Sequence, residues 1–463
     1  MRFSTYSNYQ ETDFYWLGKI PSSWQIKRVG HHTDFITGFA FKSDLFSFEK
    51  GIKLVRGDNV TEGSLRWGDK TRFWSEITKE LEQYLLKDKD LLIGMDGSKV
   101  GKNFTLIKES DLPLLLVQRV ARLRTDDQLY YKFLSYLIGS ELFRIWVTLV
   151  KTDPAIPHIS PSDIRGFPLP FPSYEEQTQI AAFLDHETAK IDTLIEKQQQ
   201  LIELLKEKRQ AVISHAVTKG LNPDAPMKDS GVEWLGEVPE HWSVAPLKYL
   251  VKEKAAGPYG ASLTKAMYVL SGIKVYGQQQ VISNDFDIGD YYISENKYKE
   301  MTRYTVYPDD VLISVMGTVG KVAVVPPTAH HGIINPRLVR YKFNTSKIKP
   351  MFVQHLIMSI RYQNRLSEAS QGSTMDGLNM GILGDLSLAL PPINEQDQII
   401  SEVNHQSSVY NKLINKAENV IILSQERRTA LISAAVTGKI DVRHWVVPTT
   451  SSDTNKTVQK VSV

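Results

Sequence analysis

Apolar residues recur at every seventh position in two long segments of the chain. The first segment carries the series Leu184, Ile191, Gln198, Leu205 and Val212, with Leu194 and Leu201 interleaved. The second carries Val403, Tyr410, Ala417, Ser424 and Leu431, with Ile399, Leu413 and Val420 between them. An average apolar spacing of about 3.5 residues is typical of long helices that pack along a coiled-coil seam. The pattern predicts two helices, over residues 174–219 and 393–437, each roughly 60 Å long at about 1.5 Å per residue.

Polar residues interrupt both apolar stripes, at Gln198 in the first and at Ser424 in the second. A single helix of this kind would expose its stripe to water, so we expect each helix to pack against the other and against helices of partner proteins. Pairing of the two helices within the chain, without a partner, is the alternative.

A mixed region precedes each long helix. Short apolar runs such as KLVRGDNV (Lys53–Val60) and LLLVQRVARL (Leu114–Leu123), separated by Gly, Asp and Asn, predict β-strands and turns. An amphipathic helix is predicted at Leu129–Trp146 and again at Pro350–Leu366. Proline-rich stretches, FPLPFP and LALPP, then stop the preceding structure and set up the start of each long helix.

The chain also repeats itself. WLGKIPSSW at residues 16–24 returns as WLGEVPEHW 218 residues later. DLLIGMDGSKVGK returns as DVLISVMGTVGK, QRVAR as PRLVR and EEQTQI as NEQDQI, all in the same order. A long internal repeat of this kind indicates two copies of one folding unit. We predict an α+β fold in which two similar α/β domains are separated by the two long helices.

The predicted domain limits follow from these landmarks. They are a first domain over 1–173, a first helix over 174–219, a linker over 220–232, a second domain over 233–392, a second helix over 393–437 and a disordered tail over 438–463. The tail is assigned because it lacks a pattern that could form a core.

Composition narrows the class of protein only slightly. The chain has 463 residues, of which 42% are hydrophobic and 23% charged, and it contains no cysteine. Disulfides and thiolate metal sites are therefore excluded. The longest apolar runs, such as LPLLLV at residues 112–117, are too short to cross a bilayer, so we expect a cytoplasmic protein with no membrane contact. The net charge of +3 is too small to indicate a nucleic-acid partner by itself.

Motifs for catalysis are not found in the sequence. The Gly-Lys turns ending at Lys102 and Lys321 do not fit a phosphate-binding loop, because Asp96 and Val315 stand where the first glycine is required and neither lysine is followed by Ser or Thr. No HExxH metal spacing and no G-x-S-x-G nucleophile turn is present. We assign no catalytic or metal-binding residue, and read the two turns as basic loops that approach nucleic-acid phosphates, with a plain structural turn as the alternative.

Taken together, WLGxxPxxW in both halves, VRGDNV, MDGSKVGK, QRVAR, PHISPSDIRGFPLPFP and EEQTQIAAFLD resemble the specificity subunit of type I restriction-modification systems. The resemblance implies two target recognition domains that read a split DNA site, held apart by two antiparallel helices. It also implies partners: double-stranded DNA, two adenine methyltransferase subunits and restriction subunits with translocase activity. This chain would be non-catalytic, and S-adenosylmethionine, ATP and Mg²⁺ would belong to the partner subunits.

The two halves differ most over residues 30–89 and 251–309, which predicts two different half-sites and an asymmetric target. Side chains suited to base edges or phosphates give the predicted DNA-binding residues, which are Arg56, Asn59, Ser98, Lys99, Lys102, Arg119, Tyr276, Gln278, Gln279, Gln280, Thr318, Lys321 and Arg337. The three consecutive glutamines suit neither a helix stripe nor a strand core. The loops Thr152-Asp153-Pro154 and Ser373-Thr374-Met375-Asp376 are further candidates to face DNA.

The helix residues predicted to bind partner subunits are Leu184, Ile191, Leu194, Leu201, Leu205, Val212, Val403, Tyr410, Leu413, Val420 and Leu431. Two other functions remain open from the sequence. One is a two-domain coiled-coil scaffold that binds proteins and never touches DNA, which the small net charge favours. The other is a degenerate hydrolase or methyltransferase with an unfamiliar motif.

Overall fold

The computed structural model describes residues 4–151, 157–371 and 377–447. The chain divides into two compact units, the first made of residues 1–197 and 420–463 and the second of residues 198–419. Each long helix therefore contributes one part to the first unit and the other part to the second, and each unit is described by itself.

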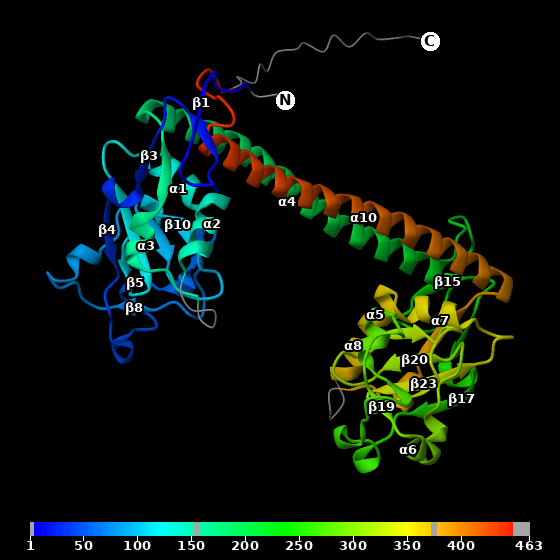
Figure 1. Ribbon diagram of the computed structural model, residues 1–463. Coiled ribbons are helices and arrows are strands. Elements are labelled where there is room, and N and C mark those ends of the chain that lie inside the picture. The colour runs from blue at the N-terminus through cyan, green and yellow to red at the C-terminus, as the bar shows by residue number, and fades with distance from the viewer. Residues whose placement is uncertain (1–3, 152–156, 372–376, 448–463) are drawn as a thin grey trace, which may run out of the picture. The chain divides into compact units, whose positions relative to one another are not determined.

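The first unit holds an N-terminal β-rich region followed by short helices and the beginning of a long one (Figure 1). Its strands are β1 (Tyr9–Glu11), β2 (Lys19–Pro21), β3 (Gln25–Arg28), β4 (Thr33–Thr37), β5 (Ile52–Val55), β6 (Val60–Thr61), β7 (Ser64–Leu65), β8 (Phe73–Trp74), β9 (Leu91–Gly94), β10 (Phe104–Leu106), β11 (Leu114–Leu116), β12 (Val120–Thr125) and β13 (Pro168–Phe171). Its helices are α1 (Tyr131–Ile138), α2 (Glu141–Val150), α3 (Pro161–Gly166) and the start of α4 (Tyr174–Lys219).

The second unit repeats this plan. Its strands are β14 (Met227–Asp229), β15 (Glu237–Pro239), β16 (Ser243–Pro246), β17 (Val251–Ala256), β18 (Ile273–Tyr276), β19 (Tyr292–Ile293), β20 (Val311–Ser314), β21 (Val322–Val324), β22 (Gly332–Ile334), β23 (Leu338–Phe343) and β24 (Ser387–Leu390). Its helices are α5 (Gln278–Ser283), α6 (Glu295–Glu300), α7 (Pro350–Ile357), α8 (Ile360–Gln371), α9 (Met380–Gly384) and the start of α10 (Ile393–Val436).

The two main sheets have the same topology in both units. The four-stranded antiparallel sheet β10-β9-β12-β4 of the first corresponds to β21-β20-β23-β17 of the second. A three-stranded sheet follows in each, in which β5 pairs parallel with β11 and antiparallel with β8, and β18 pairs parallel with β22 and antiparallel with β19. The repeat in the sequence is therefore a repeat of one α+β fold.

The predicted amphipathic helices, 129–146 and 350–366, are each two helices rather than one. α1 and α2 are joined by Gly139 and Ser140, and α7 and α8 by Met358 and Ser359. Both serines are buried and donate their hydroxyl to a carbonyl three residues back, at 2.6 Å in the first unit and 2.7 Å in the second. The apolar period continues across the break, which is why the sequence predicts one helix. At the break, each hydroxyl satisfies a carbonyl that the next turn of a continuous helix would have used.

The predicted strands are also shorter than the apolar runs that indicated them. KLVRGDNV is β5, a 3-10 turn at Gly57–Asn59, and β6. LLLVQRVARL is interrupted between β11 and β12, where Arg119 adopts a φ of 70°. Both interruptions lie at the same edge of the domain and create the turns from which the candidate site is built.

The repeated Glu-Gln motif locks the start of each long helix to its own domain. Gln177 donates to the carbonyls of Gln128 and Pro172 and accepts from the backbone of Tyr130. Gln396 does the same with Lys347, Pro391 and Lys349. Both side chains are fully buried. A buried amide with every hydrogen bond made is costly to replace, which explains why the motif occurs in both copies.

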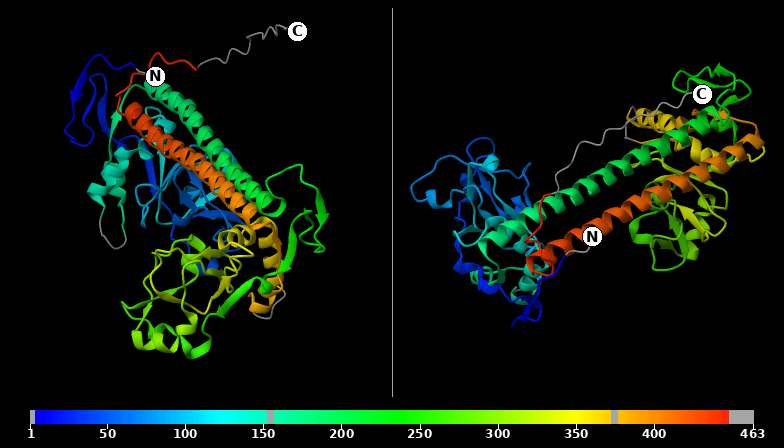
Figure 2. Two further views of the ribbon diagram at one scale, coloured as in Figure 1. Left: turned by 90° about the vertical axis from the view of Figure 1, so that its right-hand side faces the viewer. Right: turned by 90° about the horizontal axis from the view of Figure 1, so that it is seen from above.

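α4 and α10 lie side by side in both views of Figure 2. In the first unit Gln179 is hydrogen-bonded to Trp445, and Asp192 to Arg428 at 2.9 Å. Later residues of α4 therefore contact residues that come earlier in the C-terminal part of the chain. In the second unit Arg209 bonds to Asn411, and Gly220 lies beside Glu395. The two helices are therefore antiparallel in both units, as predicted.

The seam between these helices differs from the predicted one in its interleaved positions. Leu194, Leu201 and Leu413 are each 42% exposed, whereas Ile202 and Ile414 are buried. From Leu184 onward, the positions that face the partner helix follow one another by four and then three residues in turn. The interleaved position is therefore the fourth residue after each heptad position, as at Ile202 and Ile414, and not the third, as at Leu201 and Leu413. Both spacings fit an apolar stripe, and only the rotation of the helix against its partner selects one.

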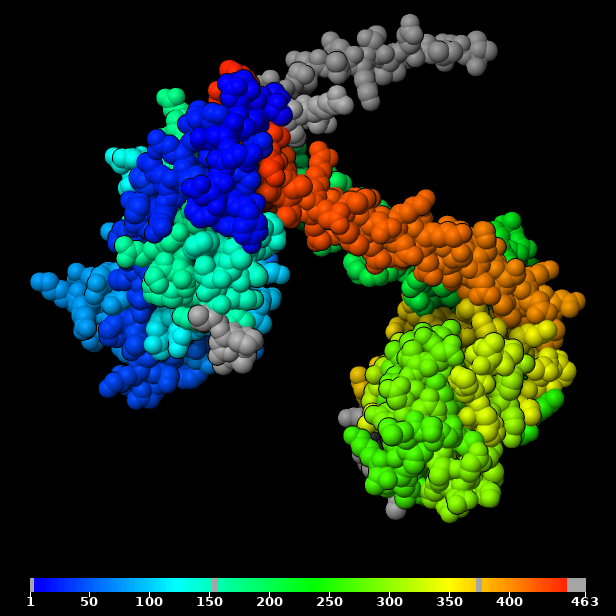
Figure 3. Space-filling view, viewed as in Figure 1, coloured from blue at the N-terminus to red at the C-terminus, as the bar shows by residue number. Residues whose placement is uncertain are grey.

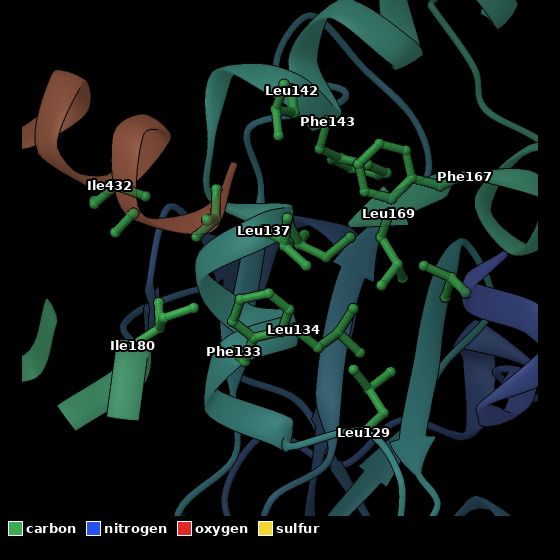
Figure 4. Close-up of a cluster of buried hydrophobic side chains, with 14 of the residues drawn as sticks. Leu129, Phe133, Leu134, Leu137, Leu142, Phe143, Phe167, Leu169, Ile180 and Ile432 are labelled. Carbon is green, nitrogen blue, oxygen red and sulfur yellow. The ribbon is translucent and has the colours of Figure 1, made fainter. Parts of the chain in front are cut away.

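A shared hydrophobic core joins α1 to the ends of both long helices in the first unit (Figure 4). Leu134 and Leu137 point from α1 toward the sheet, and Phe133 lies on the side of α1 next to Ile180 of α4. Ile432 of α10 belongs to the same core. The second unit has the same arrangement around Phe352 and Leu356, with Val217 and Ile399 from the long helices.

The predicted tail begins too early. Tyr9 donates to the carbonyl of Gly438 at 3.0 Å, Val442 is buried, and the Trp445 ring packs edge-on against Phe183. Two isolated apolar residues fill sites that the domain already offers, and this requires no periodic pattern. Residues 448–463 lie outside the described part of the chain.

Candidate nucleic-acid interface

Four of the predicted DNA-binding residues gather around one groove in the first unit. This groove has a volume of about 690 Å³, and Arg56, Ser98, Lys99 and Arg119 line it. They come from three turns, which follow β5, β9 and β11 respectively. Arg66, on the far side of the β6–β7 hairpin, adds another cation to the lining. Lys102 is exposed on the turn after β9 but does not line the groove.

Two acidic residues hold the cations of this groove. Asp96 lies 3.1 Å from the guanidinium of Arg119 and is also hydrogen-bonded to His158. Asp58 lies 3.5 Å from Lys70 and 4.0 Å from Arg56. The groove therefore combines positively charged hydrogen-bond donors with carboxylate acceptors. Cationic donors suit phosphates, and donors and acceptors together suit base edges.

The corresponding turns of the second unit bring together Gln278, Thr318 and Arg337. Arg337 donates to the side-chain oxygen of Gln278 at 3.3 Å. Gln278 donates in turn to the carbonyls of Met316 and Thr318. Gln279, Thr318 and Arg337 are exposed. This surface presents one arginine and several amides, in contrast to the cation-rich groove of the first unit.

Three predicted DNA-binding residues have internal roles instead. Asn59 is buried, accepts from the backbone of Arg56 and donates to the carbonyl of Arg66. Gln280 is buried and braces its turn in the same way, through Gly277 and Ile288. The three glutamines form the start of helix α5, contrary to the prediction that they fit no regular element, because Gln280 satisfies the free backbone N–H at the helix start.

Tyr276 is the third of these residues. Its ring is buried and its hydroxyl donates to the carbonyl of His330 at 2.7 Å. Burial raises the pKa of Tyr276 to about 12, so the phenol stays protonated as a donor to that carbonyl. Polar side chains in a turn look alike in sequence whether they point outward or brace the turn, and only the fold distinguishes them.

The two Gly-Lys turns also differ from each other. Lys102 is exposed, whereas Lys321 is half-buried and donates to Gln363 of α8 at 3.3 Å. Lys321 is therefore occupied within its own domain. The loops 152–154 and 373–376, which we predicted to face DNA, lie outside the described residues.

Sequence analysis missed Asp96 and Arg66, which line the groove, and His158, which contacts Asp96. Asp96 appeared there only as a departure from a phosphate-loop pattern. His158 reaches Asp96 from 62 positions away, and nothing local indicates that contact. Arg66 could have been found as a cation in the divergent stretch between the strands.

The helix residues predicted to bind partners separate into three groups. The half-buried ones are Leu205, Val212, Tyr410 and Val420. Leu184, Ile191, Val403 and Leu431 are buried within the units, so they are not available at the surface. Leu194, Leu201 and Leu413 are exposed, and Leu204, Ile422 and Leu423, which sequence analysis missed, are exposed by 52–63%. Figure 3 shows α10, in orange, open to the viewer along one side.

Within residues 4–151, 157–371 and 377–447, no group of three or more His, Asp or Glu side chains could hold a metal ion. No single helix of that part of the chain is long and apolar enough to cross a membrane. The bent pair α1 and α2 meets the length and composition test together, but its apolar residues, Phe133 and Phe143 among them, fill the core of the first unit.

A sequence model described as "Type I restriction modification DNA specificity domain" matches residues 21–204 and 264–422. The chain belongs to this family. The two matched stretches cover most of both repeated domains and both long helices, which confirms the family resemblance and the predicted fold class.

Curated relatives agree along most of the chain. The EcoBI specificity subunit of Escherichia coli is 25% identical over 431 residues, covering 92% of this chain and 88% of that protein. The EcoKI specificity subunit of the same species is 21% identical over 443 residues, covering 91% and 90%. The MjaVIII specificity subunit of Methanocaldococcus jannaschii is 30% identical over 200 residues, covering 42% and 45%.

Solved structures show the same fold. One chain from a study of type I R-M system assembly and conformational transition superposes with a TM-score of 0.70 at 16% identity, covering 91% of this chain and 99% of that one. The HsdS subunit of Thermoanaerobacter tengcongensis gives a TM-score of 0.51 at 15% identity, covering 91% and 98%.

Proposed function

We propose that this chain is the DNA-reading subunit of a type I restriction-modification complex and that its two units read two different parts of one split DNA site. One observation carries the proposal: both units have the same strand order, yet the turns at the same edge present different side chains. A shared frame with different reading residues suits two unlike half-sites, and hence an asymmetric target.

The groove of the first unit supports DNA as the ligand. Four cations, Arg56, Arg66, Lys99 and Arg119, line it against two carboxylates, Asp58 and Asp96, whereas the chain as a whole carries a net charge of only +3. Such a local concentration of cations favours a polyanion. This groove and the family membership disfavour the alternative of a coiled-coil scaffold that never touches DNA.

The partner subunits supply the chemistry in this proposal. Two adenine methyltransferase subunits and the restriction subunits would carry S-adenosylmethionine, ATP and Mg²⁺, and this chain would be non-catalytic. Exposed leucines and isoleucines along α4 and α10, such as Leu204 and Leu423, would dock the methyltransferase subunits by burial of apolar surface.

The deciding experiment maps N6-methyladenine genome-wide in cells that contain the methyltransferase partner, with and without this chain. A gapped, two-part, non-palindromic motif that disappears with the chain is the expected result. Methylation at an unchanged motif without the chain would contradict the DNA-reading role, and a palindromic motif would contradict the asymmetric target.

Salt dependence separates phosphate contacts from base contacts. Lys99→Ala should weaken binding of the complex to specific and random duplexes alike and reduce the slope of log K against log salt by about one. Gln279→Ala should weaken only the specific duplex, by about 1–3 kcal/mol if it contacts a base edge. Equal losses on both duplexes for Gln279→Ala would contradict its reading role.

A further inference from the structure

We infer that Asp96 and His158 are positioning residues that hold Arg119 to read a guanine in the part of the DNA site recognised by the first unit. This inference rests on the proposed DNA-reading function and adds the base class, the reading residue and the two groups that orient it.

The contacts form a chain of three side chains at the mouth of the groove. One oxygen of Asp96 lies 3.1 Å from an Arg119 nitrogen, and the other is shared by His158 and, at 3.4 Å, by the same arginine nitrogen. The Arg119 side chain is nevertheless 64% exposed, against 27% for Asp96 and 32% for His158. Arginine is thus held at one edge while most of its guanidinium stays open to a ligand.

Guanine fits the free edge of this guanidinium. Its O6 and N7 are two adjacent acceptors in the major groove, and an arginine donates to both at once through a rigid planar fork. Because Asp96 already fixes the orientation of the fork, less side-chain freedom is lost on binding. An adenine offers a donor in place of O6 and would leave one arginine N–H without an acceptor.

The backbone is built to keep the three groups together. Arg119 has a φ of 70°, which is uncommon for a residue other than glycine, and its carbonyl accepts from the backbone of Met95 at 3.0 Å. His158 is bridged to Asp96 by backbone pairing, flanked by bonds from Ile159 to Met95 and from Gly97 to Pro157, each 3.0 Å. These backbone contacts hold the three residues next to one another, so their side chains meet at the groove.

The second unit lacks this arrangement although it keeps the frame. The backbone bridge that joins Asp96 to His158 joins Met316 to Gly377 instead, so no carboxylate and no imidazole stand at those places. Arg337, the counterpart of Arg119, is reached by Gln278. The Asp96–His158–Arg119 group is therefore a property of one reading surface and not a requirement of the fold.

The test compares Asp96→Asn with Asp58→Asn in the complete complex with the methyltransferase subunits. Both changes remove one negative charge from the same groove, but Asp58 faces Arg56 and Lys70 rather than Arg119. Loss of an acid alone should strengthen binding to any DNA. Asparagine at position 96 puts an NH2 donor in place of one carboxylate oxygen, so it loses the contact of that oxygen with Arg119 or with His158. Asp96→Asn should therefore in addition lower the preference for guanine at one position.

The measurement is competitive binding to duplexes that carry each of the four bases at each position of the mapped motif. We expect guanine preference at one position in one half of the motif to fall by about 5-fold or more in Asp96→Asn and in His158→Ala. It should not fall in Asp58→Asn. Arg119→Gln should remove the preference, and Asp96→Asn added to it should change nothing further at that position.

The inference fails if the wild-type complex reads a gapped motif and Asp96→Asn lowers no single-base preference, or lowers it at every position equally. A role of Asp96 in folding alone would also overturn it, and would appear as lost thermal stability with the base preference unchanged. If the wild-type complex reads no motif at all, the proposed function itself fails, so the two failures are distinguishable.

Discussion

The first and second units share one arrangement of sheets and differ in their candidate DNA-reading surfaces. The four-stranded and three-stranded sheets pair in the same order in both. The segment after the first parallel strand differs between the units. β5 is followed by a 3-10 turn and the β6–β7 hairpin, whereas β18 is followed by helix α5. The differing segments also contribute to the core beneath them, through Val60 of β6 in the first unit and Val281 of α5 in the second. Each unit therefore completes this part of its core with side chains of its own.

A closer comparison shows how the frame supports unlike turns. Asn59 and Gln280 each stand four residues after the last residue of the strand. Each side-chain oxygen accepts from the backbone N–H of the first residue past the strand, at 3.1 and 2.8 Å. Two amides of different length therefore perform one task. The bracing residues are buried in both units, which leaves their neighbours free to differ.

The largest expected difference concerns a buried aspartate that both units share. Asp310 pairs at 3.0 Å with Arg340, whose side chain is 6% exposed, while Asp90 pairs at 2.7 Å with Arg124, which is 30% exposed. Asp310→Ala should cost about 3–5 kcal/mol because it leaves the buried Arg340 guanidinium with only the exposed Glu253, 3.7 Å away, as an acidic partner. Asp90→Ala should cost less, because Arg124 can turn to water. Hydrogen exchange of each unit, followed by mass spectrometry, measures both, and equal losses would contradict the comparison.

Two glycines should show that the frame itself is common to both units. A Cβ added at Gly38 would lie 2.1 Å from the carbonyl oxygen of Val117, and one at Gly257 would lie 2.0 Å from that of Asn335. Each change to alanine should cost about 3 kcal/mol, since backbone must move. Gly57→Ala, with no atom within 4 Å of the added carbon, is the control for thermal unfolding. If alanine at Gly38 or Gly257 left thermal stability unchanged, the backbone of that unit would not make the close approach described for it.

The bracing amides should be equivalent despite their different lengths. Asn59→Ala and Gln280→Ala each leave a backbone N–H without its acceptor, partly buried at Arg56 and buried at Gly277, which should cost about 1–3 kcal/mol. Gln279→Ala, at an exposed neighbouring position, should stay within about 0.5 kcal/mol. Chemical denaturation of the full chain checks all three, and a loss for only one of the two bracing amides would contradict their equivalence.

The smallest expected effect is a pH dependence in the second unit alone. Burial lowers the pKa of His355 below its ordinary value of 6.5, opposed by a hydrogen bond with Asn404. The unfolded chain therefore binds more protons than the folded one, so this contribution to stability is complete above pH 6.5 and is lost as the pH falls below it.

The first unit has Tyr136 at the matching helix position, bonded to Asp185 at 2.7 Å. It should show no such loss from this site between pH 7.5 and 5.5. Hydrogen exchange of the two units across this range measures the difference, and His355→Gln should remove it. A loss that persists in the variant would exclude His355 as the cause.

The sequence by itself determined the features that depend on short-range periodicity and on repetition. These are the two copies of one fold, the two long helices and the turn at Asp96–Lys102. Collinear motifs and apolar spacing are local properties, so they are readable without a structure. The repeated Gln177 and Gln396 also marked the helix starts, although their buried bonds appear only in the fold.

Only the tertiary structure decided which of the side chains that fit a pattern are buried and which are exposed. Both Leu194 and Ile195 fit the apolar stripe of the first long helix, and packing against the second helix exposes the leucine. Tyr276 and Gln280 looked like reading residues because polar side chains in turns carry no mark of direction, and the fold turns both inward. Asp96 and His158 are 62 positions apart in sequence, and only folding brings them to Arg119.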